Sequence, residues 1–290
     1  MSKSRKADLK SEAARILESV KRLAVTAPLV TLLSDFGLKD PYVPEMKAVI
    51  LTICPEARIV DISHSIEKFN VRMGAFVLAS AAPYFPAGTV HVAVVDPGVG
   101  TERRALLIQT RRAFYIGPDN GLLMLAAQKG GIIHTYAITN SEFMLPTVSS
   151  TFHGRDVFAP AAAHLLSGVL PEQFGPEISD FEVPPFAKPT RQTGRLVGEV
   201  LHVDDFGNII TNISEEDLSK ARMKTGKTLV VDLKNDHFRV NLCKTYGDAA
   251  PNSVLMLIDS HGFLELSVNQ GNASRRFGAK AGDTVRMSPT

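Results

Sequence analysis

The 290-residue sequence contains no tryptophan and only two cysteines, Cys54 and Cys243. The cysteines are far apart and form no Cys-x-x-Cys pair, so two reduced thiols of a cytosolic protein are favoured over a disulfide, which stays possible. No apolar run reaches the ~18–20 residues of a membrane span. The N-terminus has no apolar core of a secretory signal. We therefore expect a cytoplasmic protein without a membrane segment.

A large excess of one charge sign is also missing, because the formal net charge is only +2. Residues 1–28 hold seven Lys or Arg against three Asp or Glu, whereas the remaining chain holds 25 against 27 and is mildly acidic. Such a body is not expected to bind nucleic acid through its phosphates. With 44% hydrophobic residues, the chain is typical of a globular protein with one large or two smaller domains.

The common nucleotide-binding motifs are incomplete. Gly98-Val-Gly100 is not a dinucleotide fingerprint, because Arg103 occupies the third glycine position, and no Gly-Lys-Ser/Thr of a P-loop follows. The triplet Asp35-Phe-Gly37 and the run His153-Gly-Arg-Asp156 suggest a protein kinase, but their order is reversed and no glycine-rich loop precedes them. These three classes are excluded.

The first part of the chain alternates between strand and helix patterns. Strands are predicted over residues 29–33, 57–62, 89–95, 113–116 and 132–138, and helices over 42–54, 71–82, 121–129 and up to 166. This alternation predicts an α/β fold with a parallel sheet flanked by helices. An amphipathic helix over residues 7–24 is expected to dock on the body or on a partner chain, without a catalytic role.

The alternation of strand and helix patterns stops between Pro171 and Pro189, where five prolines indicate a linker. Beyond it, short strands are predicted at residues 194–203, 208–213, 228–233, 253–258, 263–268 and 283–286. Short strands separated by Gly, Asn and Asp turns favour a small β-barrel. The predicted organisation is an N-terminal extension (1–28), an α/β domain (29–190) and a smaller C-terminal β-barrel domain (191–290).

Three acids, Asp35, Asp61 and Asp96, fall at the ends of successive predicted strands. The carboxyl ends of parallel strands share one edge, where open α/β sheets bind ligands. Arg103 follows Asp96 by seven residues in a Gly-rich loop, so the loop can fold back and pair the two. Such a pair can position a water or a substrate charge, although a purely structural ion pair is an equal alternative.

A metal site would need Asp35, Asp61, His64, Asp96 and His153 to converge from separate loops. No His-x-x-x-His pair is present, and no metal is expected. His64 is expected to hold a loop by a hydrogen bond rather than to act as ligand or base. Phe69 is either a core residue or an aromatic residue that stacks on a flat ligand, and the core position is favoured.

Seven motifs occur in a fixed order along the chain: Ser34-Asp-Phe-Gly-Leu-Lys-Asp-Pro41, Asp61-Ile-Ser-His64, the stretch Asp96 to Arg104, Pro118-Asp-Asn-Gly121, Thr151-Phe-His-Gly-Arg-Asp156, Asp204-Asp-Phe-Gly-Asn208 and Ser260-His-Gly262. Together they resemble the S-adenosyl-L-methionine (SAM) hydroxide adenosyltransferases, the adenosine-forming SAM hydrolases, which are related to the SAM-dependent fluorinases and chlorinases. The resemblance covers residue 29 to the C-terminus and leaves the first 28 residues outside.

The resemblance implies a homotrimer, with each active site between the α/β domain of one subunit and the barrel of its neighbour. It implies that water displaces methionine from C5′ of the ribose of SAM, the substrate, and that no cofactor is needed. The residues that it assigns are a triad of Asp96, Arg103 and His153, and a substrate-binding set of Asp35, Asp40, Phe69, Asp204, Asn208 and Ser260. Asp35 would bind the ribose hydroxyls and Phe69 the adenosyl group.

The related halogenases carry Tyr at the positions of Asp96 and His153, so halide chemistry is not expected here. A sulfonium leaving group needs no general acid, and the enzyme must instead orient a poor nucleophile. Either Asp96 or His153 would accept the proton of the water. Two rival functions remain open at this point: a SAM- or adenosine-binding sensing module with little turnover, and a metal-dependent phosphoesterase.

Overall fold

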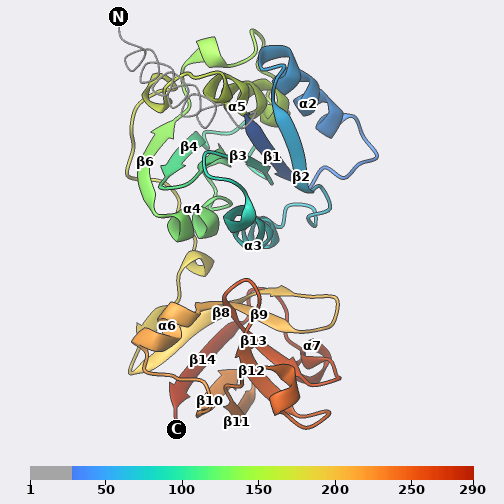
Figure 1. Ribbon diagram of the computed structural model, residues 1–290, viewed down its shortest axis with the longest axis vertical. Helices are drawn as coiled ribbons and strands as arrows, with labels where there is room; N and C mark the ends of the chain where they lie inside the picture. Colours follow the sequence, from blue (N-terminus) through green and yellow to red (C-terminus); the bar gives the residue numbers. More distant parts are fainter. Residues whose placement is uncertain (1–27) are drawn as a thin grey trace, which may run out of the picture.

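The computed structural model describes residues 28–290, which form an α/β domain and a β-barrel domain stacked along the long axis of the molecule (Figure 1). The helix predicted over residues 7–24 lies outside the described residues. Within residues 28–290, no helix is both long and apolar enough to cross a membrane.

The α/β domain is built on a six-stranded sheet in the order β2-β1-β3-β5-β4-β6. Its strands are β1 (Leu29–Ser34), β2 (Arg58–Ser63), β3 (Val90–Val94), β4 (Ala105–Thr110), β5 (Phe114–Pro118) and β6 (Ile132–Ala137). β1 pairs in parallel with β2 and β3, and β3 pairs in parallel with β5. β1 and β3 are mostly apolar and almost completely buried, because both of their faces are covered.

β4 departs from the parallel sheet that the sequence predicted, since it is antiparallel to both of its neighbours. Only residues 111–113 join β4 to β5, and such a short connection permits a hairpin but no parallel crossover. The reversed strand matters for the site, because it makes β4 begin at the edge of the sheet where β3 ends. The loop between them therefore leaves and re-enters the sheet at the same edge.

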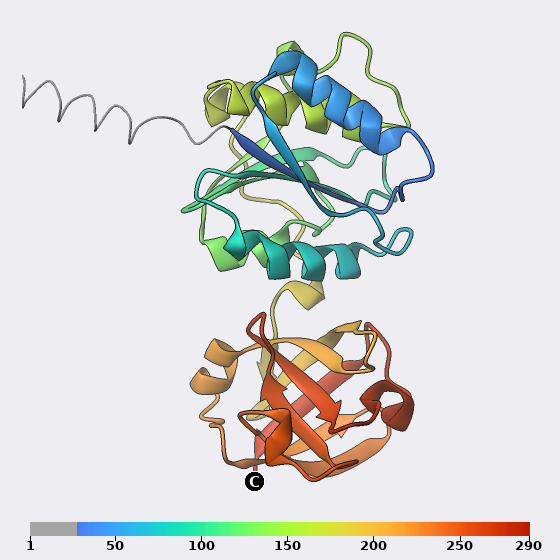
Figure 2. The ribbon, with the colours of Figure 1, turned by 45° about the vertical axis from the view of Figure 1, so that its right-hand side comes forward.

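Two helices cover each face of this sheet: α2 (Tyr42–Ile53) and α5 (Ala159–Leu166) on one, α3 (Val71–Ala81) and α4 (Met124–Gly130) on the other (Figures 1 and 2). Met46 and Ile50 of α2 pack with Val30 and Leu32 of β1. Ala75 and Leu78 of α3 pack on the opposite face. Burial of these two apolar layers holds the sheet rigid beneath the loops at its edge.

The proline-rich segment after α5 is an ordered strap. Its short 3₁₀ turns are Pro171–Gln173 and Pro185–Ala187. Phe174 and Phe186 are buried in the α/β core, and Asp180 pairs with Arg104 at 2.8 Å.

The C-terminal domain is an antiparallel barrel in the order β11-β10-β14-β8-β9-β13-β12, with β7 paired to β8. Its elements are β7 (Thr190–Gln192), β8 (Arg195–Val203), β9 (Ile209–Ser214), α6 (Glu215–Lys220), β10 (Thr228–Leu233), β11 (Asp236–Asn241), β12 (Val254–Ile258), β13 (Phe263–Val268), α7 (Ala273–Phe277) and β14 (Thr284–Pro289). A bridge between Leu242 and Met256 nearly closes the barrel. Together, the two domains confirm the predicted fold class.

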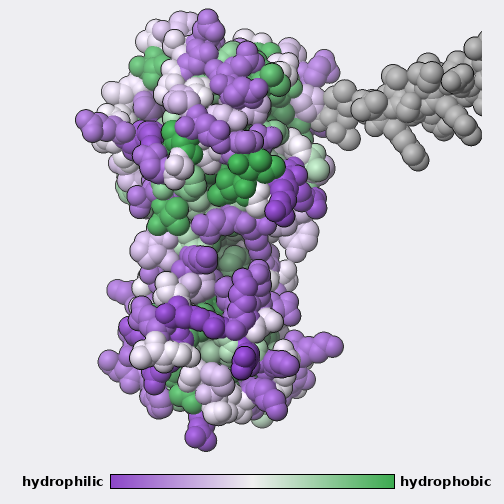
Figure 3. Space-filling model, turned by 90° about the vertical axis from the view of Figure 1, so that its left-hand side faces the viewer, coloured by the Kyte–Doolittle hydropathy of each residue, from purple (hydrophilic) through white to green (hydrophobic). Residues whose placement is uncertain are grey.

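The two domains meet where α3 lies against the barrel (Figure 2). Phe76 of α3 is buried, with its ring 5.2 Å from that of His202 and 5.8 Å from that of Phe263. Arg72 at the start of α3 pairs with Glu199 of β8 at 2.9 Å. On the side shown in Figure 3, hydrophobic surface gathers on the α/β domain, whereas the barrel is mostly hydrophilic.

Candidate active site

A cavity of about 410 Å³ opens at the carboxyl edge of the parallel strands. Its lining comes from the loops after β1, β2 and β3 and from the segment that precedes α5, and includes Asp35, Phe69, Asp96 and His153. Backbone loops at this edge are held in place by the sheet below them, as in other open α/β folds. Two of the three predicted strand-end acids therefore share this cavity.

Asp96 and His153 line this cavity, and Arg103 joins them into one hydrogen-bonded chain. Nε of Arg103 donates to Oδ1 of Asp96 at 2.9 Å, and its terminal nitrogen donates to Oδ2, which makes the pair bidentate. The same terminal nitrogen lies 2.8 Å from Nδ1 of His153. Only 6% of the Asp96 side chain and 9% of the Arg103 side chain are exposed. A bidentate pair shielded from water fixes both side chains in one geometry.

The loop between β3 and β4 needs its glycines to bring Arg103 back to Asp96. Gly100 has φ +77°, and a Cβ there would lie 2.2 Å from the backbone oxygen of Ser150. The loop is thus pressed against the segment that carries His153, and no side chain fits between them. Nδ2 of Asn120 supports the loop from below by donating to the oxygen of Val95 at 2.9 Å.

His153 stands at the start of a π-helical turn, Gly154–Phe158, that leads into α5. Such turns recur at functional sites, where they reorient a side chain within a helix. Asp156 is fully buried and accepts a hydrogen bond from the backbone N–H of Ser149 at 2.8 Å. Arg155 binds Asp156 at 2.7 Å and Glu45 of α2 at 2.9 Å, so the turn is anchored on both sides.

The contact with Arg103 decides the tautomer of His153. A guanidinium has only donors, so Nδ1 of His153 must accept, and the neutral ring then carries its proton on Nε2. Burial and the neighbouring Arg103 lower the pKa of His153 below 6.5, which keeps the ring neutral at physiological pH. In this state Nε2 is a donor, and the remaining lone pairs of Asp96 are acceptors.

Asp35 is held by residues from the loop after β2. Its Oδ2 accepts from the backbone N–H of Phe69 at 2.9 Å, and Nζ of Lys68 donates to its backbone oxygen. Nδ1 of His64 lies 2.7 Å from Oγ of Ser34 at the end of β1, and its Nε2 lies 3.2 Å from Oδ1 of Asp61, so His64 links the ends of β1 and β2. Asp61 instead faces outward and pairs with Lys47 at 2.6 Å, so it does not share the cavity.

Phe69 is not a core residue, so the interpretation that the sequence favoured is wrong. Its side chain is 68% exposed at the cavity, and its backbone has φ +65°. A bulky residue in the left-handed region is strained, and such strain gathers at functional sites. Of the two roles expected for Phe69, burial in the core is therefore excluded, and stacking on a flat ligand remains.

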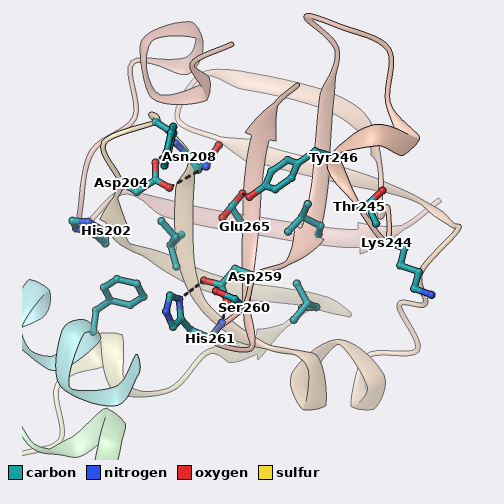
Figure 4. Close-up of a pocket in the computed structure, with 15 residues that line it drawn as sticks. His202, Asp204, Asn208, Lys244, Thr245, Tyr246, Asp259, Ser260, His261 and Glu265 are labelled. Atoms are coloured by element: carbon teal, nitrogen blue, oxygen red, sulfur yellow. Dashed lines mark hydrogen bonds and ion pairs between the residues drawn. The ribbon is translucent and has the colours of Figure 1, made fainter. Parts of the chain in front are cut away.

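A second cavity, of about 530 Å³, lies in the barrel domain (Figure 4). Asp204, Asn208 and Ser260 all line it. The carboxylate of Asp204 accepts from the backbone and the side-chain amide of Asn208 at 2.8 and 3.0 Å. Ser260 lies in the tight turn between β12 and β13, where Gly262 has φ +81°.

Both halves of the chain match family models. The model of the SAM hydroxide adenosyltransferase N-terminal domain matches residues 30–175, and that of the C-terminal domain matches residues 198–286. The chain belongs to the SAM hydroxide adenosyltransferase family.

Individual relatives agree with this assignment. The (R)-S-adenosyl-L-methionine hydrolase of Salinispora arenicola is 37% identical, covering 91% of this chain and 98% of its own. The hydrolase of the same name from Thermus thermophilus is 40% identical over 89% of this chain and 98% of its own. A fluorinase of Actinoplanes sp. is 31% identical over 90% and 97%. A crystal structure of an uncharacterised conserved protein from Thermotoga maritima superposes with a TM-score of 0.78 at 39% identity, covering 89% of this chain and 99% of that one.

In this member of the family, the structure divides the predicted site residues into two groups. The α/β cavity is lined by Asp35, Phe69, Asp96 and His153, and Arg103 is bonded to the last two. Asp204, Asn208 and Ser260 instead line the barrel cavity. Asp40 is exposed and lines neither cavity. Within residues 28–290, no three His, Cys, Asp or Glu side chains gather as a metal site would require.

Sequence reasoning missed several cavity residues. Phe36, Tyr42 and Phe152 form an aromatic cluster in the α/β cavity, with ring centroids 5.0–5.5 Å apart. Tyr246 and Glu265 face each other in the barrel cavity (Figure 4). Phe36 and Phe152 belong to two of the seven sequence motifs, and this position is the signal that could have identified them. Tyr246 and Glu265 lie outside every motif, and only the folded barrel brings them together.

Proposed function

We propose that this protein hydrolyses SAM to adenosine and L-methionine by attack of water on C5′ of the ribose. The oxygen of the water forms the new bond to C5′, the C5′–S bond breaks, and its electron pair stays on sulfur as a neutral thioether. The proton of the water leaves to a base. This proposal is carried by one observation in a protein of this family: Asp96 and His153 face the same cavity and are joined through Arg103 by hydrogen bonds.

The linked residues suit the orientation of a water. The water would donate to a free lone pair of Asp96 and accept from Nε2–H of His153, so its own lone pair would be held along one direction. Arg103 would hold the carboxylate of Asp96 and the ring of His153 in fixed positions. Because Nδ1 of His153 accepts from Arg103, Asp96 is the better proton acceptor of the two candidates. Fixing a nucleophile in line with its target is worth several kcal/mol.

The substrate would span both kinds of cavity. Asp35 would accept from the ribose hydroxyls and Phe69 would lie against the adenosyl group, with Asp40 near the loop entrance. Asp204, Asn208 and Ser260 would hold the remaining parts of SAM from the barrel of a neighbouring subunit. A homotrimer would bring the two cavities together. Exposed apolar side chains support such a contact, since Leu38 is 74% exposed, Phe69 68% and Phe206 79%.

Purified protein incubated with SAM in the presence of a chelator tests the proposal, with the products separated by chromatography. We expect adenosine and methionine from the wild type, and a loss on the order of 10²–10⁴-fold for Asp96→Ala and His153→Ala. His134→Ala is the matched control, because His134 pairs with Glu177 at the surface away from both cavities.

The other outcomes separate the rivals. Asp96→Ala with full turnover would overturn the mechanism. Tight SAM binding without products would favour a sensing module, and activity lost only on chelation would favour a metal-dependent reaction.

A further inference from the structure

Glu265 of β13 is a buried carboxylate at the barrel cavity, with only 3% of the residue exposed. Its Oε1 accepts a hydrogen bond from the hydroxyl of Tyr246 at 2.7 Å and another from the hydroxyl of Ser267. Figure 4 shows the Tyr246 ring reaching across the cavity to this carboxylate. Tyr246 itself comes from a separate turn, Tyr246–Asp248, and the residue is 44% exposed.

This carboxylate is costly to the fold. Within the described residues, no lysine or arginine forms an ion pair with Glu265, and the charged groups that act on its pKa are the carboxylates of Asp204 and Asp259. Burial raises the pKa of Glu265 above 4.5, and the two neighbouring carboxylates raise it further. A glutamine would accept the same two hydrogen bonds without a charge. The negative charge therefore has no structural use that the contacts reveal.

We propose that Glu265 is a positioning and specificity residue, which holds the Tyr246 ring in place and makes this cavity wall favour a cationic sulfonium over a neutral thioether. The proposal rests on SAM as the substrate. The sulfonium carries a permanent positive charge that both products lack. A negative wall shielded from water would therefore bind the substrate more tightly than the thioether that leaves.

Two variants separate the hydrogen bond from the charge. Tyr246→Phe keeps the ring and the charge but removes the bond, whereas Glu265→Gln keeps an acceptor and removes the charge. We expect the KM for SAM to rise about 10-fold in Glu265→Gln, the loss typical of one charged interaction, with kcat little changed. Tyr246→Phe should give a smaller rise, on the order of 3-fold.

Inhibition by S-adenosylhomocysteine, the neutral thioether analogue, measures the specificity. Glu265→Gln should narrow the wild-type preference for SAM over this analogue by about 10-fold, and Tyr246→Phe should not. Glu216→Gln, on the exposed face of α6, and Tyr136→Phe, in the α/β domain, are matched controls that should behave as wild type.

Stability distinguishes this role from a structural one. Because the pKa of Glu265 is raised in the folded protein, its ionisation destabilises the fold above pH 4.5. Glu265→Gln should therefore unfold at an equal or higher temperature than wild type at neutral pH while binding SAM less well. The KM of wild type should also rise on acidification through this pKa, and the KM of Glu265→Gln should stay flatter. Asp204, Asp259, His202, His261 and Lys244 also face this cavity and are present in both proteins, so the difference between the two KM profiles is what reports on Glu265.

Unchanged KM and unchanged preference in Glu265→Gln would overturn the inference, as would a variant that merely unfolds earlier. Failure of the proposed function is separate. If the wild type binds SAM without hydrolysing it, the dissociation constants of SAM and S-adenosylhomocysteine for the same variants replace KM, and the same 10-fold narrowing is expected.

Discussion

The two cavities of this chain differ in how their charges are arranged. In the α/β cavity, Asp96 is paired with Arg103, and Lys68 binds the backbone of Asp35. In the barrel cavity, Asp204, Asp259 and Glu265 gather, with Lys244 the single lysine or arginine of its lining. A charged side chain that is held by an oppositely charged partner keeps a fixed orientation, which a reaction with water requires. A cavity with a surplus of negative charge instead attracts a positively charged ligand. This contrast agrees with the proposed function, in which the α/β cavity carries the reaction and the barrel cavity contributes to substrate binding.

The largest effect is expected when inactive variants of the two cavities are mixed. Asp96→Ala and the double variant Asp204→Ala/Asn208→Ala should each be inactive alone. If every site combines two subunits, co-refolded mixtures should regain about a quarter of wild-type turnover, since one site in four then pairs an intact α/β domain with an intact barrel.

Turnover of each mixture, measured before and after co-refolding, checks this expectation. If one chain supplied both halves of its own site, no mixture would recover activity.

Replacement of Arg103 by lysine should be the next largest effect. Lysine keeps the charge but cannot bind both oxygens of Asp96 and Nδ1 of His153 at once. We expect kcat to fall on the order of 100-fold through loss of orientation, with KM little changed. Steady-state kinetics measure it, with Arg111→Lys as control. A kcat equal to wild type would show that the charge alone suffices.

Phe76→Ala tests the contact between the domains. Phe76 lines the barrel cavity although it belongs to α3, and its ring packs against His202, His261 and Phe263. Truncation should cost about 3–5 kcal/mol of stability. It should also raise KM, because the wall of the barrel cavity is lost.

Denaturant unfolding and kinetics of Phe76→Ala, compared with Phe143→Ala, separate the two effects. Phe143 packs on Phe174 inside the α/β domain and touches neither cavity, so its truncation should lower stability alone. If Phe76→Ala and Phe143→Ala had the same KM, Phe76 would have no role in substrate binding at the barrel cavity.

The smallest effect concerns pH. Burial and Arg103 hold the pKa of His153 below 6.5, so the neutral ring that accepts from Arg103 persists into mildly acidic solution. We expect kcat/KM to stay level as the pH falls to 6.5 and to decline only below it, when protonation of Nδ1 breaks the link. A pH–rate profile measures this. An acidic limb centred at or above 6.5 would contradict the assignment.

Much of the fold was readable from the sequence, because apolar runs and proline breaks follow directly from burial. β11 was missed, since its Asp236-His-Phe-Arg-Val-Asn241 pattern is largely exposed on an edge strand. The core position expected for Phe69 was wrong because it relied on how often phenylalanine is buried in general. This phenylalanine is instead held at a positive φ in a loop. Asp61 was grouped with Asp35 and Asp96 because its strand ends at the same edge, but its side chain turns outward to Lys47.

The sequence by itself determined the two domains, the family motifs and the acid and arginine of one loop, because each is local in the chain. Only the tertiary structure showed how Arg103 joins Asp96 to His153, since this required an antiparallel β4 and a glycine pressed against Ser150. It also decided that the proposed substrate-binding residues fall into two cavities. It joined Tyr246 of a 3₁₀ turn to Glu265 of β13, which no local pattern connects. Contacts between distant residues depend on packing of the whole sheet, and that packing is not written in any short stretch of sequence.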